Sequence, residues 1–274
     1  MLKSLFAALA LWTAAAVPSA AADSFRIGVA PHTSARVIIA QYQPVRAALE
    51  AALGDPVEVI TAPDFTEFAR RAVAGEYDLA ITTAHQAELL RADAGYLPLL
   101  TYTADFRSVV VVPAASPACG TKALEGAVVL GLDPSSLVTL WGQHWLGNVR
   151  ATPRQIRYVS AADSVAQLLL AGEAQAGFMS LANFHKLAPD VQAQLRLDVQ
   201  SDPIPGRVYM LNDRQAARQE TIGAALLRFG ASPEGKRYFD ENKLDGYRPI
   251  SVAELKGMAP FADEVRRILK AGGQ

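Results

Sequence analysis

Residues 128–146 read VVLGLDPSSLVTLWGQHWL, and this succession of strand, turn and helix decides the fold class. Val128–Gly131 is a short apolar run of the kind that predicts a strand in a buried parallel sheet. Asp133, a proline and two serines form a polar turn, and residues 134–146 carry the helical pattern that follows. A buried strand that passes through a short turn into a helix is the repeating unit of an α/β fold.

The same alternation extends from this stretch in both directions. Further strands are predicted at residues 25–30, 57–60, 79–82, 97–103, 156–159, 176–179, 195–199 and 208–211. Helices are predicted from Pro44, from Asp64, from about residue 85, over about 161–171, 215–229 and 233–242, and over 252–270 with a break at Pro260. Asp64 and Glu67 have the spacing of a capping box.

Two extended stretches connect the α/β series. Residues 106–112 are a long β-branched run, and residues 202–206 (DPIPG) form a turn before the strand at 208–211. We expect the backbone to cross at both places between two lobes, with residues 23–104 and 208–274 in lobe I and residues 105–207 in lobe II. Ligands of open α/β sheets bind beyond the carboxyl ends of the strands, so a ligand cleft is expected between the lobes.

The composition excludes several classes of protein. The chain has 274 residues, of which 51% are hydrophobic and 19% charged, too apolar for a disordered protein. A formal net charge of −1 argues against a nucleic-acid-binding protein, which normally presents a basic surface. Cys119 is the only cysteine, so no intramolecular disulfide can form.

The first 22 residues have the parts of a secretory signal peptide. Lys3 supplies a positive charge, residues 5–17 are apolar, and Ala20 and Ala22 form an A-x-A pattern. The apolar run is shorter than the roughly 20 residues needed to span a bilayer. We expect cleavage after Ala22 and a periplasmic mature chain.

Five stretches resemble motifs of one family and occur in that family's order. They are residues 61–65 (TAPDF), 74–80 (AGEYDLA), 106–109 (FRSV), 131–136 (GLDPSS) and 203–206 (PIPG). Together they resemble the periplasmic phosphate-, phosphite- and phosphonate-binding proteins of ABC transporters, a type II class of solute-binding protein. The resemblance implies a non-enzymatic, two-lobed protein without cofactors that binds a small anion and delivers it to an inner-membrane permease. We expect a monomer.

The turn at Ser135 and Ser136 is the leading candidate for anion binding. The first turn of a helix has free amide hydrogens and a partial positive charge, and the serine hydroxyls add donors. Simple capping of the helix by either serine is the alternative. Ser160 precedes the next helix and has the same two interpretations.

Further polar residues follow the first and third strands and are expected to rim the cleft. Departures from the family pattern also bear on the ligand, because Phe65 and Phe106 replace two tyrosines and remove two hydroxyl donors. Another small anion, or a less charged and more apolar one, would suit such a pocket. Arg107 and Arg207 lie at the crossings and offer paired donors to an oxyanion. The candidate ligand-binding residues are Thr33, Ser34, Phe65, Thr82, Thr83, His85, Phe106, Arg107, Ser135, Ser136 and Ser160.

Other chemistries are less well supported by the sequence. His32 and His85 both follow strands, but no H-x-x-H or H-E-x-x-H spacing supports a metal site. A hydrolase would need a G-x-S-x-G nucleophile elbow, which the sequence lacks. The alternative to transport is a co-receptor that senses an oxyanion or a metalloid such as arsenite for a membrane sensor kinase, and Cys119 is the residue that would bind the metalloid.

Overall fold

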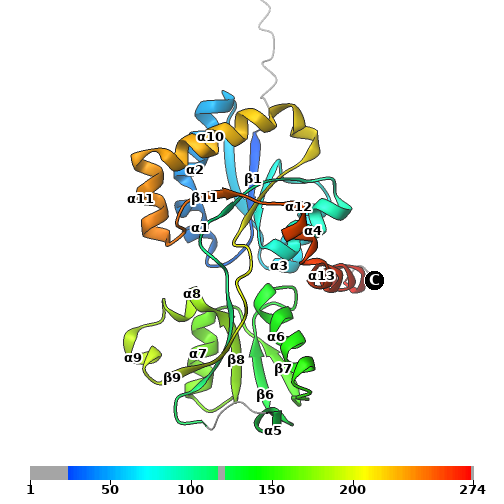
Figure 1. Cartoon of the computed structure of the whole chain (residues 1–274), viewed down its shortest axis with the longest axis vertical. Coiled ribbons are helices and arrows are strands. Elements are labelled where there is room, and N and C mark those ends of the chain that lie inside the picture. Colours follow the sequence, from blue (N-terminus) through cyan, green and yellow to red (C-terminus); the bar gives the residue numbers. More distant parts are fainter. Residues whose placement is uncertain (1–23, 117–120, 273–274) are drawn as a thin grey trace, which may run out of the picture.

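The computed structural model describes residues 24–116 and 121–272, which fold into two α/β lobes (Figure 1). The predicted signal peptide and Cys119 lie outside the described residues. Lobe I is built on a six-stranded sheet of order β11-β4-β10-β3-β1-β2, and lobe II on a five-stranded sheet of order β7-β6-β8-β5-β9. The strands of lobe I are β1 (Phe25–Val29), β2 (Val57–Thr61), β3 (Leu79–Thr82), β4 (Leu97–Tyr102), β10 (Val208–Leu211) and β11 (Tyr247–Pro249). Those of lobe II are β5 (Ser108–Pro113), β6 (Val128–Gly131), β7 (Gln155–Tyr158), β8 (Ala176–Ser180) and β9 (Leu195–Gln200).

Helices pack on both sheets. In lobe I they are α1 (Ala35–Gln41), α2 (Gln43–Leu53), α3 (Phe65–Val73), α4 (Ala84–Asp93), the 3₁₀ helix η1 (Asp213–Arg218), α10 (Gln219–Ala231), α11 (Pro233–Asn242), α12 (Val252–Lys256) and α13 (Ala259–Ala271). In lobe II they are α5 (Thr121–Leu124), α6 (Leu137–Asn148), α7 (Ala162–Leu170), α8 (Leu181–Phe184) and α9 (Pro189–Gln192).

The return strand β10 fixes how the two ends of the chain meet. β1 pairs in parallel with β2 and β3, whereas β10 runs antiparallel between β3 and β4. Val208 therefore lies opposite Thr82, at the carboxyl end of β3. The chain therefore re-enters lobe I at the edge of the sheet where a ligand is expected to bind.

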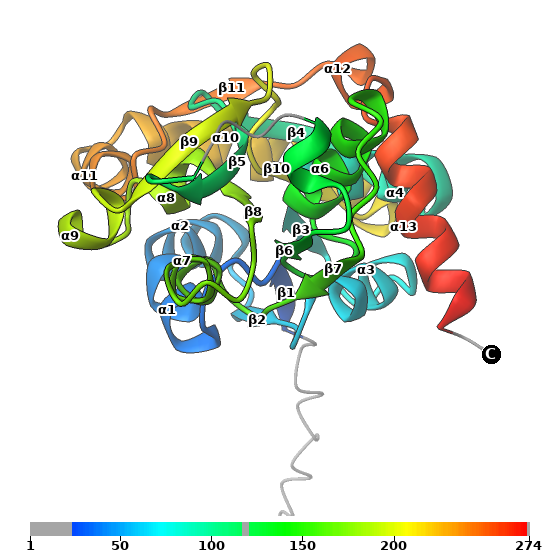
Figure 2. The same ribbon diagram turned by 90° about the horizontal axis from the view of Figure 1, so that it is seen from below.

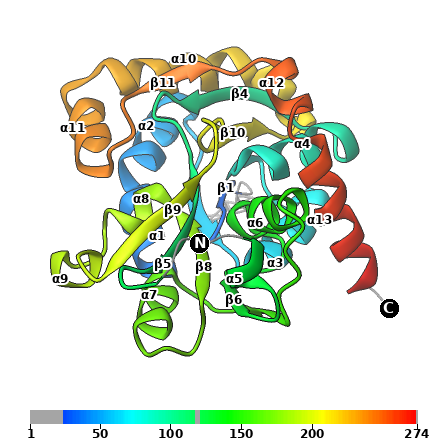
Figure 3. The same cartoon turned by 60° about the horizontal axis from the view of Figure 1, so that its bottom comes forward.

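Two connecting segments run side by side between the lobes (Figures 1 and 3). Phe106 and Ile204 form an isolated antiparallel bridge, each amide donating to the other carbonyl at 2.9 Å. The sequence pattern predicts a strand that begins at Phe106, whereas β5 begins at Ser108. The bridge at Phe106 explains this difference.

Two predicted helices begin elsewhere. α6 begins at Leu137 and not at Pro134, because Ser136 is its N-cap and the Asp133 carboxylate holds the preceding residues in a turn. The C-terminal helices separate at Gly257 and Met258, while Pro260 lies in the first turn of α13. Proline is favoured there because the amide hydrogen it lacks would have no helical partner.

The first helix of lobe I and the predicted capping box also differ from expectation. The helical pattern from Pro44 belongs to α2, which begins at Gln43, and α1 precedes it. Asp64 caps α3 by accepting the amide of Glu67, but the Glu67 carboxylate pairs with Arg70 and Arg71 instead of returning to the cap.

The C-terminal helix α13 ties the lobes together on one side. It runs beside α4 and also contacts α3 and, in lobe II, α6 (Figure 2). Leu140 of α6 shares a buried apolar cluster with Ala69, Leu89, Ala262 and Val265 of lobe I. The His144 and Phe261 rings lie 4.6 Å apart across the same contact.

Candidate functional site

The turn before α6 is held by its own side chains. The Ser135 hydroxyl donates to Asp133 Oδ1 at 2.6 Å, and the Ser135 amide donates to the same oxygen at 2.7 Å. The Ser136 hydroxyl accepts the amide of Thr139 at 3.4 Å and donates to the Thr139 hydroxyl at 2.9 Å. Both serine hydroxyls therefore have partners within lobe II.

The same turn makes polar contacts with lobe I. The Thr66 hydroxyl of α3 lies 3.1 Å from Ser135 Oγ, and Nε2 of His85 lies 2.9 Å from the Ser135 carbonyl oxygen. Ser135 is fully buried and Ser136 nearly so. These two serines lie at the lobe junction, and in this structure their donors are satisfied by the protein.

His85 is a buried, uncharged member of this junction. A carbonyl oxygen only accepts, so Nε2 carries the hydrogen, and Nδ1 is buried without a hydrogen-bond partner. Burial lowers the pKa of His85 to about 4, and its hydrogen bond to Ser135 opposes this shift.

The other candidates in lobe I fall into two groups. The Thr82 hydroxyl donates to Gln86, whereas the Thr83 hydroxyl is buried without a partner. Thr33 and Ser34 are exposed at the start of α1, and Ser34 is its N-cap without a side-chain cap bond. Only the first pair is enclosed by the fold.

Both phenylalanines are half-buried in one apolar cluster. Phe65 and Phe106 pack against the cluster that contains Leu137 of α6, and Ile204 belongs to the same contact. The substituted aromatic positions thus present hydrocarbon at the junction. Ser160, by contrast, is exposed, and Ala161 is the N-cap of α7, so Ser160 is not a helix cap.

The arginines at the crossings have different surroundings. Arg107 donates from Nη1 to the Ser201 carbonyl at 3.2 Å, a contact within lobe II. Arg207 is half-buried, and its Nε is fully buried without a partner. Ser108, the first residue of β5, also has a buried hydroxyl without a partner.

His32 lies close to two cations. Its pKa is lowered to about 3 by burial and by the charges of Arg207 and Lys186. Lys186, just after α8, has its own pKa lowered by burial, by Arg207 and by Lys243. No local feature of the sequence distinguishes Lys186 from any other lysine near the end of a short helix.

Near Arg207, lobe I contains a network of hydrogen-bonded tyrosine hydroxyls. Tyr102 is bonded to Tyr209 at 2.7 Å and to Tyr238 at 2.9 Å, and lies 3.4 Å from the Tyr42 hydroxyl. Tyr209 is bonded in turn to Tyr247 at 2.9 Å. Burial raises the pKa values of Tyr102, Tyr209, Tyr238 and Tyr247, so these four hydroxyls stay protonated at neutral pH.

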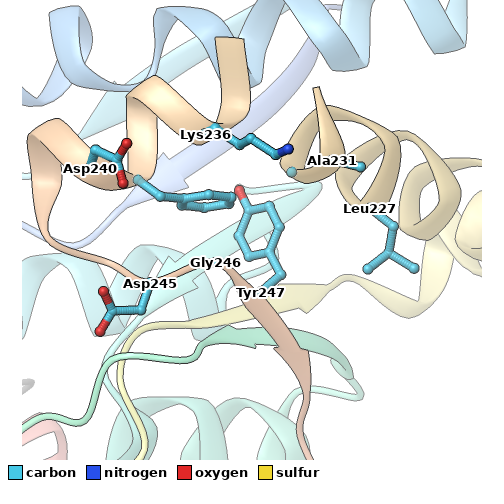
Figure 4. Close-up of a pocket in the computed structure, with 9 residues that line it drawn as sticks. Leu227, Ala231, Lys236, Asp240, Asp245, Gly246 and Tyr247 are labelled. Atoms are coloured by element: carbon cyan, nitrogen blue, oxygen red, sulfur yellow. The ribbon is translucent and has the colours of Figure 1, made fainter. Parts of the chain in front are cut away.

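Two surface cavities lie near the groups described above. One, of about 400 Å³, lies at the lobe junction between the start of α3 and Asp133. The other, of about 560 Å³, lies on lobe I beside Lys236, Asp240, Asp245 and Tyr247 (Figure 4). In the first, Glu67 pairs with both Arg70 and Arg71.

Two further features concern residues 24–116 and 121–272 only. No group of three or more histidine, cysteine or acidic side chains is placed to hold a metal ion. No helix in these ranges has the length and apolar character needed to cross a membrane.

Comparison with known proteins shows to which family the chain belongs. A model of the periplasmic substrate-binding protein of phosphonate ABC transporters matches residues 27–255. Solved structures with similar folds include PhnD1 from Prochlorococcus marinus in complex with methylphosphonate, at 14% identity over 89% of this chain and 98% of that chain, with a TM-score of 0.77. A Xanthomonas citri protein bound to ATP matches at 18% identity over 89% and 98%, with a TM-score of 0.74. The aliphatic sulphonate binding protein SsuA from Escherichia coli matches at 15% identity over 89% and 92%, with a TM-score of 0.61. A search of curated proteins found no significant match.

Two α/β lobes joined by a double crossing define a type II periplasmic binding protein, as the sequence analysis predicts. The chain belongs to the family of periplasmic substrate-binding proteins of phosphonate ABC transporters. Members of this family are solute-binding proteins and not enzymes, and they deliver small ligands to ABC permeases.

Proposed function

We propose that this protein captures a small oxyanion of the phosphate, phosphite or phosphonate type between its lobes and delivers it to an inner-membrane ABC transporter. In this proposal, residues 23–104 and 208–274 form one lobe of the protein, and residues 105–207 form the other. Residues 1–22 serve as the export signal.

One observation carries the proposal: buried donors without partners gather where the chain crosses between lobes. The Thr83 hydroxyl follows β3 in lobe I, the Ser108 hydroxyl opens β5 in lobe II, and Arg207 Nε directly precedes β10. Buried polar groups of native proteins are almost always paired, and an unpaired one costs about 1–3 kcal/mol. Hydroxyls and a guanidinium are donors that suit an oxyanion.

The crossing also supports closure around the ligand. The two connecting segments are joined by the Phe106–Ile204 bridge, and a narrow connection of this kind permits hinge motion. A ligand that contacts both lobes favours the closed form by its differential affinity for that form. The closed form is then what the permease recognises.

Paired threonine variants test the proposal. Thr83→Val removes a hydroxyl that has no protein partner, so we expect little loss of stability in the ligand-free protein but weaker oxyanion binding. Thr82→Val is the matched control, because its hydroxyl donates to Gln86 and its loss lowers stability without ligand.

Thermal unfolding of the wild-type protein against phosphate, phosphite, methylphosphonate, aminoethylphosphonate and sulfate gives the direct measurement. A ligand at 100 times its Kd adds about 2.7 kcal/mol, which raises the Tm by roughly 5–10 °C for a chain of this size. No shift with any of these anions would refute the proposed function.

A further inference from the structure

Helix α6 of lobe II presents one of its faces to lobe I. Leu137, Leu140 and His144 are three and four positions apart, a spacing that places side chains on the same face of a helix. Leu137 is buried in a cluster with lobe I residues that include Phe68 and Leu90. The stripe of α6 that begins with Leu137 therefore packs on lobe I.

Helix α13 belongs to lobe I by its contacts. It lies along α4 and also packs against α3. Arg266 donates from Nε and Nη2 to the two carboxylate oxygens of Asp93, the last residue of α4, at 2.6 and 2.8 Å. Ala262 and Val265 are buried in one cluster with Leu89 of α4. We therefore expect α13 to move with lobe I in any motion of one lobe relative to the other.

The two helices meet through apolar side chains. Leu140 is only 1% exposed and shares its cluster with Val265 of α13. One turn further along α6, the His144 ring lies 4.6 Å from the Phe261 ring. His144 Nε2 lies 3.8 Å from Glu264 Oε1, which is beyond hydrogen-bond distance. Separation of α6 from α13 exposes Leu140 to water, which is unfavourable.

We propose that α6 and α13 form a clasp that keeps the two lobes together in the absence of ligand. The clasp consists of Leu140 and His144 on α6 and of Phe261 and Val265 on α13. Both helices lie on the same side of the two connecting segments (Figures 1 and 3). Rotation of the lobes about these segments separates the clasp, so the apolar contact opposes opening.

The clasp bears on how a ligand acts. A ligand bound between the lobes stabilises a closed form that the chain itself already favours. The apparent affinity then depends on the fraction of molecules that are closed before the ligand binds. The inference concerns the ligand-free protein and goes beyond the proposed function, because it holds whichever ligand the protein captures.

Small-angle X-ray scattering of the ligand-free protein tests the clasp. The wild-type radius of gyration should match that calculated for the structure, in which the lobes are in contact. Leu140→Glu places a carboxylate in the apolar cluster and should raise the ratio of open to closed molecules by about a hundred-fold or more, with a larger radius of gyration. Gln143→Glu is the matched control, because it adds the same charge to α6 at a side chain that contacts Tyr158 of lobe II. Its radius should equal that of the wild type.

A second variant leaves the buried cluster intact. His144 is half-buried, and His144→Glu places a carboxylate beside Glu264, so that two like charges repel across the clasp and the radius of gyration should increase. Addition of Glu264→Lys to this variant replaces the repulsion by attraction and should restore the wild-type radius. Circular dichroism verifies that each variant is folded, and if Leu140→Glu does not fold, the His144→Glu variant and its rescue decide alone.

Two results would overturn the inference. One is a wild-type protein that is already open without ligand. The other is a wild-type radius of gyration in the folded Leu140→Glu and His144→Glu variants. Because no ligand is present in these measurements, neither result bears on the proposed binding of an oxyanion.

Discussion

Lowering the pH should reduce the stability of the folded protein through protonation of His85. The imidazole is fully buried at the lobe junction, and burial lowers its pKa from 6.5 to about 4. As the pH falls through 6.5 the unfolded chain takes up a proton at this residue, whereas the folded protein does so only near pH 4. The folded state therefore loses stability across this window, and above pH 7 the residue makes no pH-dependent contribution.

The size of the effect follows from the shift. The full difference between the two pKa values corresponds to about 3 kcal/mol, of which about 2 kcal/mol is reached at pH 5. Replacement of His85 by glutamine keeps a donor for the Ser135 carbonyl and removes the titrating group. Between pH 8 and pH 5, the wild-type protein should lose about 2 kcal/mol more stability than His85→Gln.

Urea unfolding at the two pH values measures this difference directly. Other groups titrate in both proteins, His32 among them, so the comparison between variant and wild type isolates His85. His185→Gln removes an imidazole from an exposed position after α8 and serves as the control for the substitution itself at pH 8. Equal losses in wild type and His85→Gln would show that His85 is not desolvated in the folded state.

Two further predictions concern other parts of the molecule. Ser136→Ala removes the N-cap of α6 and should cost about 1 kcal/mol in urea unfolding, a value near zero contradicting the capping geometry. Tyr102→Phe removes the hydroxyl at the centre of the tyrosine network and should cost about 1–3 kcal/mol, whereas Tyr158→Phe, on the surface, should change stability by less than about 0.5 kcal/mol.

Much of the architecture could be predicted from local pattern. Short apolar runs such as Val128–Gly131 mark strands because a parallel strand is buried on both faces, and β6 occupies these same residues. The long run after residue 105 and the turn at 202–206 indicate the double crossing, since each leaves one α/β series for the other. The observed boundaries of helices and strands differ from the predicted ones where a side chain makes a local hydrogen bond, as at Ser136 before α6.

The partners of the site residues were decided only by tertiary structure. Sequence alone places Ser135 at the start of a helix, but its contacts with Thr66 and His85 join residues that lie 69 and 50 positions away. Lys186 carries no local signal, yet the fold brings its charge beside Arg207 and His32. Strand and helix patterns depend on neighbours a few residues apart, whereas hydrogen bonding and electrostatics depend on whichever groups the folded chain brings together.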